Sequence, residues 1–527
     1  MRELFLIPAT VLYLLVVILL FAYGLNFLYL TWIAWRSSRQ AVAPEALPEP
    51  WTDWPAVTVQ LPIYNELYVV ERLVEAAARL DYPAGKLQIQ LLDDSTDETT
   101  ELAQLAAARW RAAGIDIMVQ HRQDRQGYKA GALQQGMATA TGEFIAIFDA
   151  DFVPPPDFLQ RTLPHFDAAN VAFVQTRWGH LNRRYSLLTF LQSLALDAHF
   201  MIEQFARSRG AYLFNFNGTA GIWRKAALEA AGGWQADTLT EDLDISYRAY
   251  LQGWVGRYAR DIVVPAELPV HFAGFRRQQH RWARGSLECA IKHIPQIWRQ
   301  PISRGRKIQA TLHLTGYGIH LLMLIMVLLY PAVLAITQAY PGLVSLFGLG
   351  YVFNLSAVAP IILFATGQQQ IGRSWQRLMP RLIFVMVAGV GLMVNTARAA
   401  LQILLRRTDS FERTAKFGIQ KRRQIWTNKR YQLGLDPIIF WELGLVFYTS
   451  WTIYLAWQLD NWAIVIYGSL MSAGLLFVVG MTITHTLAVR WQQTGAPALT
   501  PLPQELAWSE TGATRSALGS EQQESAG

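Results

Sequence analysis

The sequence predicts an α/β domain with a mostly parallel sheet, inserted between membrane-spanning helices. Between Arg39 and Arg299, short β-rich runs alternate with amphipathic helical runs, as in "LQIQLLDD" followed by "TELAQLAAARW". Such repeated alternation is typical of a sheet with helices on both faces. Outside this stretch, apolar runs are long enough to cross a bilayer. The whole chain is 52% hydrophobic and 16% charged, whereas soluble domains average about a quarter charged residues.

The apolar runs predict a multi-pass membrane protein with five spans. The first run is too long for the core of a signal peptide, so we interpret it as a retained anchor. A sixth run, Leu382–Leu405, carries Asn395 and Arg398 and is less apolar than the others. The five predicted spans cover about Leu4–Trp32, Ala310–Ile336, Leu343–Phe364, Ile438–Trp457 and Trp462–Val489.

Basic residues gather beside these runs and indicate how the chain is oriented. The net charge of +7 is concentrated near residues 36–39, 299–307 and 406–430. Such clusters mark the cytoplasmic side of membrane spans rather than a nucleic-acid partner. If residues 382–405 crossed, the block from Arg406 would lie outside, so we interpret that run as an interfacial helix, with a sixth span as the alternative. The α/β domain is then expected in the cytoplasm, at a bacterial inner (plasma) membrane.

Polar residues stand at the ends of three predicted strands, in "QLPIYNE", "LLDDSTDE" and "IFDAD". The carboxyl ends of parallel strands meet at one edge of a sheet, so these residues should converge on one crevice. That crevice is acidic, because it contains Asp93, Asp94, Asp149 and Asp151. Carboxylates suit a hard divalent cation, Mg²⁺ or Mn²⁺, which also takes phosphate oxygens. A solvated turn is the alternative for an isolated Asp-x-Asp, but here the motif ends a buried strand.

Two later stretches add a candidate base and a candidate sugar platform. "LTEDLDISYRAY" places Thr240, Glu241 and Asp242 at the start of a helical pattern, where an N-cap followed by first-turn acids is the alternative interpretation. "FRRQQHRWARGSLECAIKHIPQIW" has the pattern of a basic amphipathic helix, for which membrane-surface attachment is the simpler role. Trp282 beside Arg281 nevertheless offers an indole face to a sugar ring and donors to hydroxyls or phosphate.

Along the chain these motifs follow one another as Asp94, Asp149-Ala-Asp151, Thr240-Glu-Asp242 and Gln278-Gln-His-Arg281-Trp282. In this order they resemble the membrane-embedded family 2 glycosyltransferases, the group of cellulose, mannan, chitin and hyaluronan synthases. "QLPIYNE", "QLLDDSTDETT", "FNFNGTAGIWR" and "QQHRWARG" look most like the cellulose-synthase-like A and C branch. The resemblance is dense over Val57–Trp298. It continues loosely to "FERTAKFG" (Phe411–Gly418), which is similar to the FxVTxK gating loop but has Arg413 where that motif has valine.

The resemblance implies a GT-A-type domain that binds a nucleotide sugar. The implied reaction is an inverting, metal-dependent transfer of a hexose, from UDP-glucose or GDP-mannose, to a growing β-linked glycan that is exported across the bilayer. The implied cofactor is Mg²⁺ or Mn²⁺. A lipid glycosyltransferase, adding a sugar to diacylglycerol or ceramide, is the alternative because it shares the four motifs. A transporter or receptor with a nucleotide-binding domain would need no base, so Asp242 argues against that class.

The resemblance also implies roles for individual residues. The general base would be Asp242. The residues implied at the nucleotide sugar are Asp93, Asp94, Lys129, Asp149, Gln278 and Arg281. Those implied at the acceptor are Asn217, Gly218, Thr219, Glu241 and Trp282. The implied metal ligands are Asp149 and Asp151, and the implied gating-loop residues are Phe411, Arg413, Thr414 and Lys416.

These interpretations together divide the chain into segments. The predicted segments are a transmembrane anchor (1–36), the glycosyltransferase domain (50–272), an amphipathic interfacial helix (273–308), a transmembrane region (309–490) that includes the interfacial helix (382–405) and the gating-like loop (408–420), and a disordered tail (491–527).

Overall fold

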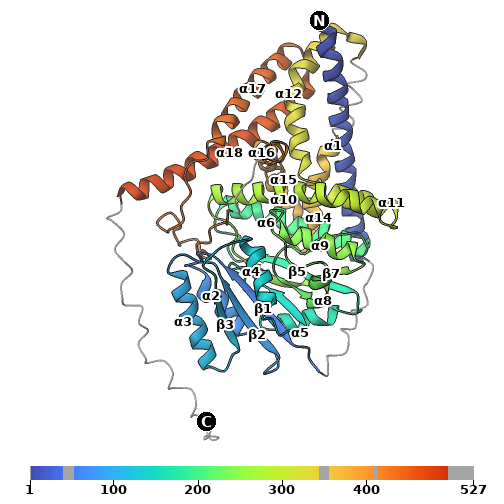
Figure 1. Ribbon diagram of the computed structural model, residues 1–527. Coiled ribbons are helices and arrows are strands. Elements are labelled where there is room, and N and C mark those ends of the chain that lie inside the picture. Colours follow the sequence, from blue (N-terminus) through green and yellow to red (C-terminus); the bar gives the residue numbers. More distant parts are fainter. Residues whose placement is uncertain (1, 40–52, 344–354, 407–411, 496–527) are drawn as a thin grey trace, which may run out of the picture.

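The computed structural model describes residues 2–39, 53–343, 355–406 and 412–495. A seven-stranded sheet with its helices forms the lower half of the molecule, and long apolar helices rise from it on one side (Figure 1). The N-terminal end of the first helix lies at the far end of this apolar bundle from the sheet. The expected arrangement, an α/β domain between apolar helices, is confirmed.

The sheet is mixed, with most neighbouring strands parallel. Its order is β3-β2-β1-β4-β6-β5-β7. Only β6 runs antiparallel to its neighbours, β4 and β5. The sequence pattern did not predict this strand, because it has four residues and no alternation of its own. The strands are β1 (Val57–Ile63), β2 (Leu87–Asp93), β3 (Ile117–His121), β4 (Phe144–Ile147), β5 (Val171–His180), β6 (Gly221–Arg224) and β7 (Val255–Ala266).

Both faces of the sheet are covered by helices. One apolar core joins β1 and β2 to α2 and α3, and a second joins β4 and β6 to α4, α8 and α9. Such strands are buried on both sides, which explains why they are nearly continuous apolar runs. The helices of this domain are α2 (Val70–Ala78), α3 (Thr99–Ala112), α4 (Tyr128–Met137), α5 (Phe158–Thr162), α6 (Leu187–Ala198), α7 (Phe205–Arg209), α8 (Lys225–Ala230) and α9 (Glu241–Leu251).

Polar residues within the buried strands satisfy one another across the sheet. Gln60 of β1 donates from Nε2 to Gln90 of β2 at 3.0 Å, and Thr58 donates to Gln88 at 2.8 Å. Buried amides are costly without a partner, so this pairing allows glutamine inside the domain. It also fixes the register of β1 against β2, and therefore the relative position of the two strand ends that reach the site.

Among the described residues, five helical stretches are long and apolar enough to cross a membrane. The predicted second span is displaced, because the chain first forms a short helix, α11, and only then the apolar helix α12. The predicted span at 343–364 falls partly on undescribed residues, and its described end belongs to the short helix α14. The helices outside the sheet domain are α1 (Arg2–Arg39), α10 (Phe272–Arg299), α11 (Arg304–Leu314), α12 (Gly318–Ala339), α14 (Ala359–Gln370), α15 (Trp375–Val390), α16 (Met393–Leu404), α17 (Ile438–Gln458) and α18 (Trp462–Gly495).

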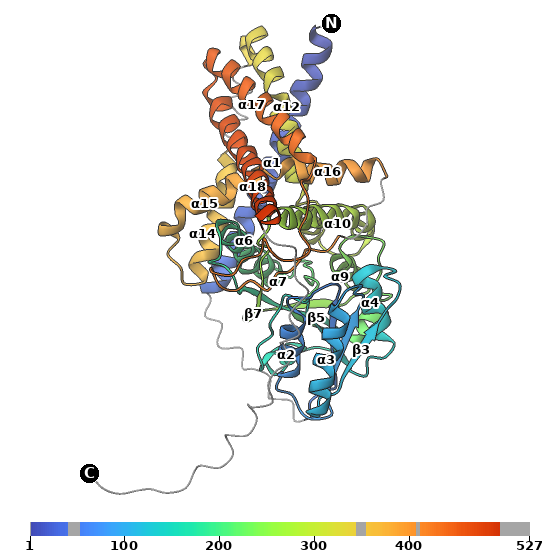
Figure 2. The ribbon, with the colours of Figure 1, turned by 90° about the vertical axis from the view of Figure 1, so that its left-hand side faces the viewer.

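The run predicted to be one interfacial helix at 382–405 forms parts of two helices, α15 and α16. The combined stretch Trp375–Leu404 has the length and hydropathy of a span, but the chain breaks near Gly391, and α16 lies across the foot of the apolar helices (Figure 2). The two polar residues of this run have tertiary partners. Asn395 donates to the backbone carbonyl of Arg276 at 3.0 Å, and Arg398 pairs with Asp436 at 3.2 Å.

Helix α10 lies between the apolar helices and the sheet and is bonded to both (Figures 1 and 2). On the membrane side, buried Arg276 pairs with Glu442 of α17 at 3.0 Å and donates to Thr482 of α18 at 2.8 Å. On the sheet side, Gly285 packs so closely on Thr240 that an added Cβ would lie 2.5 Å from the threonine side chain. The helix therefore sets the distance between the start of α9 and the membrane helices.

Candidate active site

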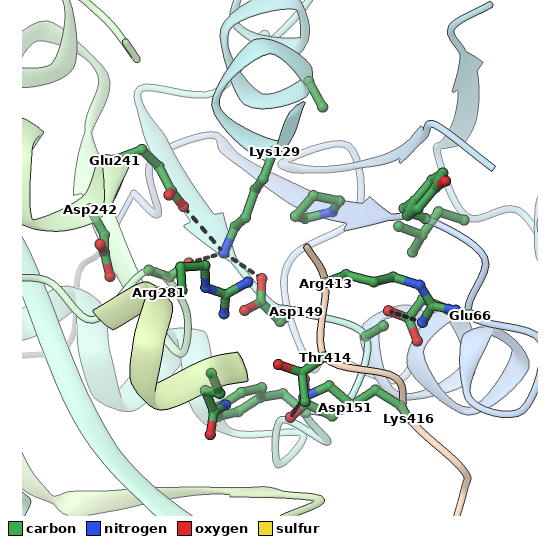
Figure 3. Close-up of a pocket in the computed structure, with 18 of the residues that line it drawn as sticks. Glu66, Lys129, Asp149, Asp151, Glu241, Asp242, Arg281, Arg413, Thr414 and Lys416 are labelled. Atoms are coloured by element: carbon green, nitrogen blue, oxygen red, sulfur yellow. Dashed lines mark hydrogen bonds and ion pairs between the residues drawn. The ribbon is translucent and has the colours of Figure 1, made fainter. Parts of the chain in front are cut away.

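The residues predicted at the strand ends lie around one pocket of about 150 Å³. Its walls are the ends of β1 and β4, the starts of α4 and α9, one face of α10, and a loop of residues 412–418 (Figure 3). The sequence-predicted residues that line it are Asp94, Lys129, Asp149, Asp151, Asn217, Gly218, Glu241, Asp242, Gln278, Arg281, Trp282, Arg413, Thr414 and Lys416.

Two predicted residues lie behind the pocket wall instead, and a third, Phe411, is outside the described residues. Asp93 is fully buried and accepts hydrogen bonds from the backbone N–H of Ser95 at 2.9 Å and from Thr100 Oγ1 at 2.6 Å. Thr219 accepts the backbone N–H of Asp149 at 2.8 Å. Both side chains support the strand ends from behind, so neither Asp93 nor Thr219 lines the pocket as expected.

Lys129 is the central cation of the half of the pocket formed by the end of β4 and the starts of α4 and α9, here called the inner half. Its Nζ lies 2.5 Å from Asp149 Oδ1 and 3.7 Å from Glu241 Oε1, and it donates to the Gly218 carbonyl at 2.9 Å (Figure 3). Burial alone would lower the pKa of Lys129, but Asp149 and Glu241 outweigh it and raise that pKa. The ammonium therefore stays charged and holds the end of β4 against the start of α9.

Asp242 lies in the first turn of α9 and faces the turn at Gly218. The backbone of Gly218 has φ +79°, and a Cβ there would lie 2.9 Å from Asp242 Oδ2. Only glycine fits both the backbone conformation and the close approach. Burial, and next the charge of Glu241, raise the pKa of Asp242 to about 7. A carboxyl with this pKa can accept a proton near neutral pH, which suits a general base.

Thr240 is the N-cap residue of α9, as in the alternative interpretation of its motif as a helix cap with acidic residues in the first turn. That interpretation holds only in part. Its side chain makes no capping hydrogen bond, and its hydroxyl lies 3.6 Å from the thiol of Cys289 on α10. The first turn of α9 is thus fixed by packing on α10. Arg281 and Trp282, on the pocket face of the same helix, are held in register with Asp242.

The 412–418 loop is docked into the pocket by its backbone and by two cations. Lys416 Nζ lies 2.6 Å from Asp151 Oδ2, and the Phe417 N–H donates to Glu267 at 3.1 Å. Gly418 has φ +65°, and a Cβ there would lie 2.7 Å from the Tyr68 carbonyl. Arg413 reaches Glu66, at the end of β1, with 3.4 Å between Nη1 and Oε1.

Several pocket residues were not singled out from the sequence, among them the polar residues Tyr64, Glu66 and Arg125. Glu66 and Tyr64 belong to "QLPIYNE", so the polar end of a buried strand was their signal. Arg125 lies in a loop with no motif, and only the fold brings it to the pocket. Arg122, which does not line the pocket, forms a bidentate ion pair with Asp94. Its Nε lies 2.6 Å from Oδ1 and its Nη2 lies 2.5 Å from Oδ2, so the orientation of that carboxylate is fixed.

The two aspartates of the Asp-x-Asp motif fit a divalent cation by their chemistry. They present carboxylate oxygens from the end of one strand into the same pocket, the donor type that Mg²⁺ and Mn²⁺ prefer. In the structure their charges are compensated by lysines, Asp149 by Lys129 and Asp151 by Lys416. Lys129 belongs to a packed helix and Lys416 to a loop, so movement of the loop would free the carboxylate of Asp151 rather than that of Asp149.

A second cluster, Asp244, Cys289 and His293, has the spacing of a metal site but not the chemistry. Asp244 already contacts Lys292 Nζ at 2.7 Å and Arg248 Nε at 2.8 Å. Burial raises the pKa of the Cys289 thiol to about 12, so the thiolate that would bind a metal is not formed at neutral pH. The cluster ties α9 to α10 instead.

Comparison with known proteins agrees with this geometry. Residues 55–285, which include every pocket residue except those of the loop, match the family described as "Glycosyltransferase like family 2". This region of the chain is therefore similar to glycosyltransferase family 2 domains. The predicted GT-A-type α/β fold class is confirmed, and the match bears out the predicted family resemblance over these residues.

Two curated relatives that match this part of the chain are plant proteins. Glucomannan 4-beta-mannosyltransferase 2 of Arabidopsis thaliana is 45% identical over 253 residues, covering 47% of this chain and 47% of that protein. Glucomannan 4-beta-mannosyltransferase 1 of Oryza sativa subsp. japonica is 42% identical over 270 residues, covering 50% and 52%. The chain thus spans about half the length of the curated relatives it matches. The expected bacterial membrane has no support from these relatives.

Among solved structures, the chain is similar to the mannosyltransferase PcManGT from Pyrobaculum calidifontis, in complex with GDP-Man and Mn²⁺. The two are 21% identical with a TM-score of 0.45, over 74% of this chain and 100% of that one. It is also similar to Staphylococcus aureus TarS 1-349 in complex with UDP-GlcNAc, with 16% identity and a TM-score of 0.36, over 60% and 92% of the two chains.

Proposed function

We propose that this protein transfers mannose from a nucleotide sugar to a growing β-linked glycan and passes the product across the membrane. The observation that carries the proposal is the convergence, in one pocket, of Asp149 and Asp151 with Asp242 and Trp282. The first pair suits a nucleotide diphosphate with its metal, and the second suits an acceptor sugar. The names of the relatives, glucomannan mannosyltransferases, support mannose as the sugar.

Asp242 is the proposed general base. It removes the proton from the acceptor hydroxyl as that oxygen attacks the anomeric carbon from the face opposite the leaving diphosphate, which inverts the configuration. Its buried position keeps its pKa near 7, so it is basic enough to take a proton and still ionised in part at neutral pH. Gly218 gives the acceptor oxygen access by leaving the space beside Asp242 free of a side chain.

Arg281 and Lys129 stabilise the leaving group in this proposal. Both are cations carried by helices, Lys129 by α4 and Arg281 by α10, and both line the pocket with Asp149. They therefore face developing negative charge without first having to move. Asp149 and Asp151 would hold a divalent cation, which supplies further positive charge to the diphosphate when it is bound.

Trp282 positions the acceptor in the proposed reaction. Its indole lines the pocket one residue after Arg281, so a sugar ring lying on it stays beside Asp242. The apolar helices α1, α12, α17 and α18 extend beyond α10 on the side away from the sheet and offer a route for a hydroxylated polymer that cannot cross lipid unaided. Basic residues at the sheet-side end of α1, Arg36 and Arg39, support a cytoplasmic domain in this proposal, because positive residues favour the cytoplasmic end of a span.

The product separates this proposal from the lipid-acceptor alternative. Purified protein with a nucleotide-linked mannose and Mn²⁺ should make a size-dispersed glycan that a β-mannan-specific glycosidase digests. Asp242→Asn should abolish product, a loss of about a thousandfold or more, while nucleotide affinity in a titration stays within about twofold of wild type. Mass spectrometry that finds only a lipid carrying one or two hexoses would overturn the polymer. Turnover retained in Asp242→Asn would remove that residue from the base role.

A further inference from the structure

Glu66 and Arg413 form an ion pair in the half of the pocket formed by the end of β1 and the 412–418 loop, here called the outer half. The proposed reaction makes no use of this pair. Glu66 follows β1, and Arg413 comes from the 412–418 loop. Their side chains are 9% and 14% exposed, and Oε1 lies 3.4 Å from Nη1. The glycosyltransferase gating motif that this loop resembles has valine at the position of Arg413. A charged residue here changes what the outer pocket can bind.

The pair leaves hydrogen-bonding capacity unused inside the pocket. Oε2 of Glu66 is buried and has no hydrogen-bond partner among the described residues, and Nη1 of Arg413 is too far from Oε1 for a good hydrogen bond. A buried carboxylate oxygen without a partner is costly, and native proteins keep few such groups unless a ligand completes them. Burial raises the pKa of Glu66 to about 8, so its ionised, accepting form needs N–H donors from a ligand. The site therefore offers an acceptor that a ligand would complete, next to the donor Arg413, both within the lining.

Flat side chains of Tyr64, Arg125 and Arg413 line the same part of the pocket, and Tyr431 supports Arg413 from outside the lining. The guanidinium of Arg125 lies 3.5 Å from the ring centroid of Tyr64, and the guanidinium of Arg413 lies 4.3 Å from that of Tyr431. Stacked aromatic and guanidinium planes are the surfaces on which proteins bind nucleobases. Asp94, held by Arg122, borders this region as well. The outer pocket thus combines a stacking surface with an acceptor–donor pair.

We propose that Glu66 and Arg413 select the base of the donor nucleotide, and that the pair is matched to guanine rather than uracil. The edge of guanine presents a carbonyl oxygen beside two N–H donors, so a carboxylate accepts two hydrogen bonds while a guanidinium donates to O6 or N7. Uracil presents a single N–H between two carbonyl oxygens, and a carboxylate facing it meets at least one of those oxygens. The inference rests on the proposed function, because it assumes that this pocket binds a nucleotide sugar.

The preference for guanine arises mainly because uracil would leave a buried polar group without a hydrogen bond, and less because guanine gains extra binding free energy. With uracil, Oε2 of Glu66 stays unpaired or lies against a carbonyl oxygen in a buried site. A site built to hydrogen-bond a donor group rejects an analogue that lacks the group. Because Arg413 is carried by the loop, the base would also hold that loop against the pocket, and binding of the donor would be coupled to closure.

The test is a binding titration that needs no transfer. The full-length protein in detergent, with Mn²⁺, is titrated with GDP and with UDP by calorimetry. We expect wild type to prefer GDP by about tenfold or more, the discrimination of one good two-pronged contact. Arg413→Val, the residue of the family motif, and Glu66→Gln should each lose most of that preference, by weakening GDP more than UDP.

Arg430→Val is the matched control. Arg430 pairs with Glu98 at 2.7 Å and so also joins the segment after α16 to the sheet domain, but it does not line the pocket. If Arg413 only docks the loop, Arg413→Val and Arg430→Val will weaken both nucleotides alike. That result, or a wild type that binds UDP as tightly as GDP, overturns the inference.

The outcomes also separate this inference from the proposed function. A GDP preference that depends on Glu66 and Arg413, in a protein that makes no glycan, supports base selection and refutes the polymerase. Glycan synthesis from a uridine-linked hexose, with equal affinity for GDP and UDP, supports the transferase and refutes base selection.

Discussion

The two halves of the pocket are built in different ways. In the inner half, Lys129 and the carboxylates it contacts belong to α4, α9 and the end of β4, elements that share one apolar core. In the outer half, the cations Arg413 and Lys416 are brought by a loop, and Lys416 meets Asp151 across 265 residues of sequence. The inner half is held by packing within the sheet domain. The outer half depends on a loop that has one apolar anchor, Phe417, while its pocket-facing residues are held by polar contacts that a ligand can replace. We therefore expect the inner half to be preformed and the outer half to rearrange.

Replacing the two lysines should expose this difference most strongly. Lys129→Met leaves Asp149 and Glu241 without their cation, so we expect a lower thermal unfolding midpoint and loss of transfer. Lys416→Met should leave the midpoint close to wild type and raise the affinity for Mn²⁺, because it removes the cation that competes for Asp151. Thermal unfolding followed by fluorescence and Mn²⁺ titration by electron paramagnetic resonance measure both. Equal destabilisation by the two variants would contradict the distinction.

Substitution of Gly218 should reduce transfer through the inner half of the pocket without changing any charged side chain. Gly218→Ala places a Cβ 2.9 Å from Asp242 in a backbone with φ +79°, so we expect transfer to fall about a hundredfold through displacement of the base. Gly253→Ala is the control, since its φ is +86° but nothing lies within 4 Å of the added Cβ. Both variants carry a similar backbone cost of roughly 1–2 kcal/mol. Activity that falls equally in both would show that strain, and not the approach to Asp242, is responsible.

The smallest expected effect is a shift of the pH profile. The pKa of Asp242 is raised to about 7 by burial and by Glu241. Below that pH the carboxyl keeps its proton and cannot act as base, so transfer at saturating donor should increase as the pH rises through about 7. Glu241→Gln removes the neighbouring charge and should move the midpoint to lower pH. Glu143→Gln, which changes a carboxylate outside the pocket, should not. An unchanged midpoint in Glu241→Gln would mean that another group controls the rate.

The inner half could be predicted from the sequence because its residues stand at recognisable places. Asp149 and Asp151 end a continuous apolar strand, and Asp242 begins a helical pattern, so local periodicity placed them at one edge of a sheet. The same reasoning put Asp93 in the pocket, although it lies beneath it. Two adjacent residues at a strand end point to opposite faces, and the sequence does not say which face is open.

The outer half and the membrane helices depended on contacts between distant segments. The sequence by itself determined the alternation of strands and helices, the acidic strand ends and the apolar runs, because these follow from local periodicity and side-chain chemistry. The tertiary structure alone decided that Arg413 meets Glu66 and that Asn395 donates a hydrogen bond to α10. It also decided that Gly391, at the end of α15, packs on the backbone of Gly474 in α18. Such pairings join residues that are far apart in the chain. Their energies arise only when both partners leave water together, and no local pattern records that event.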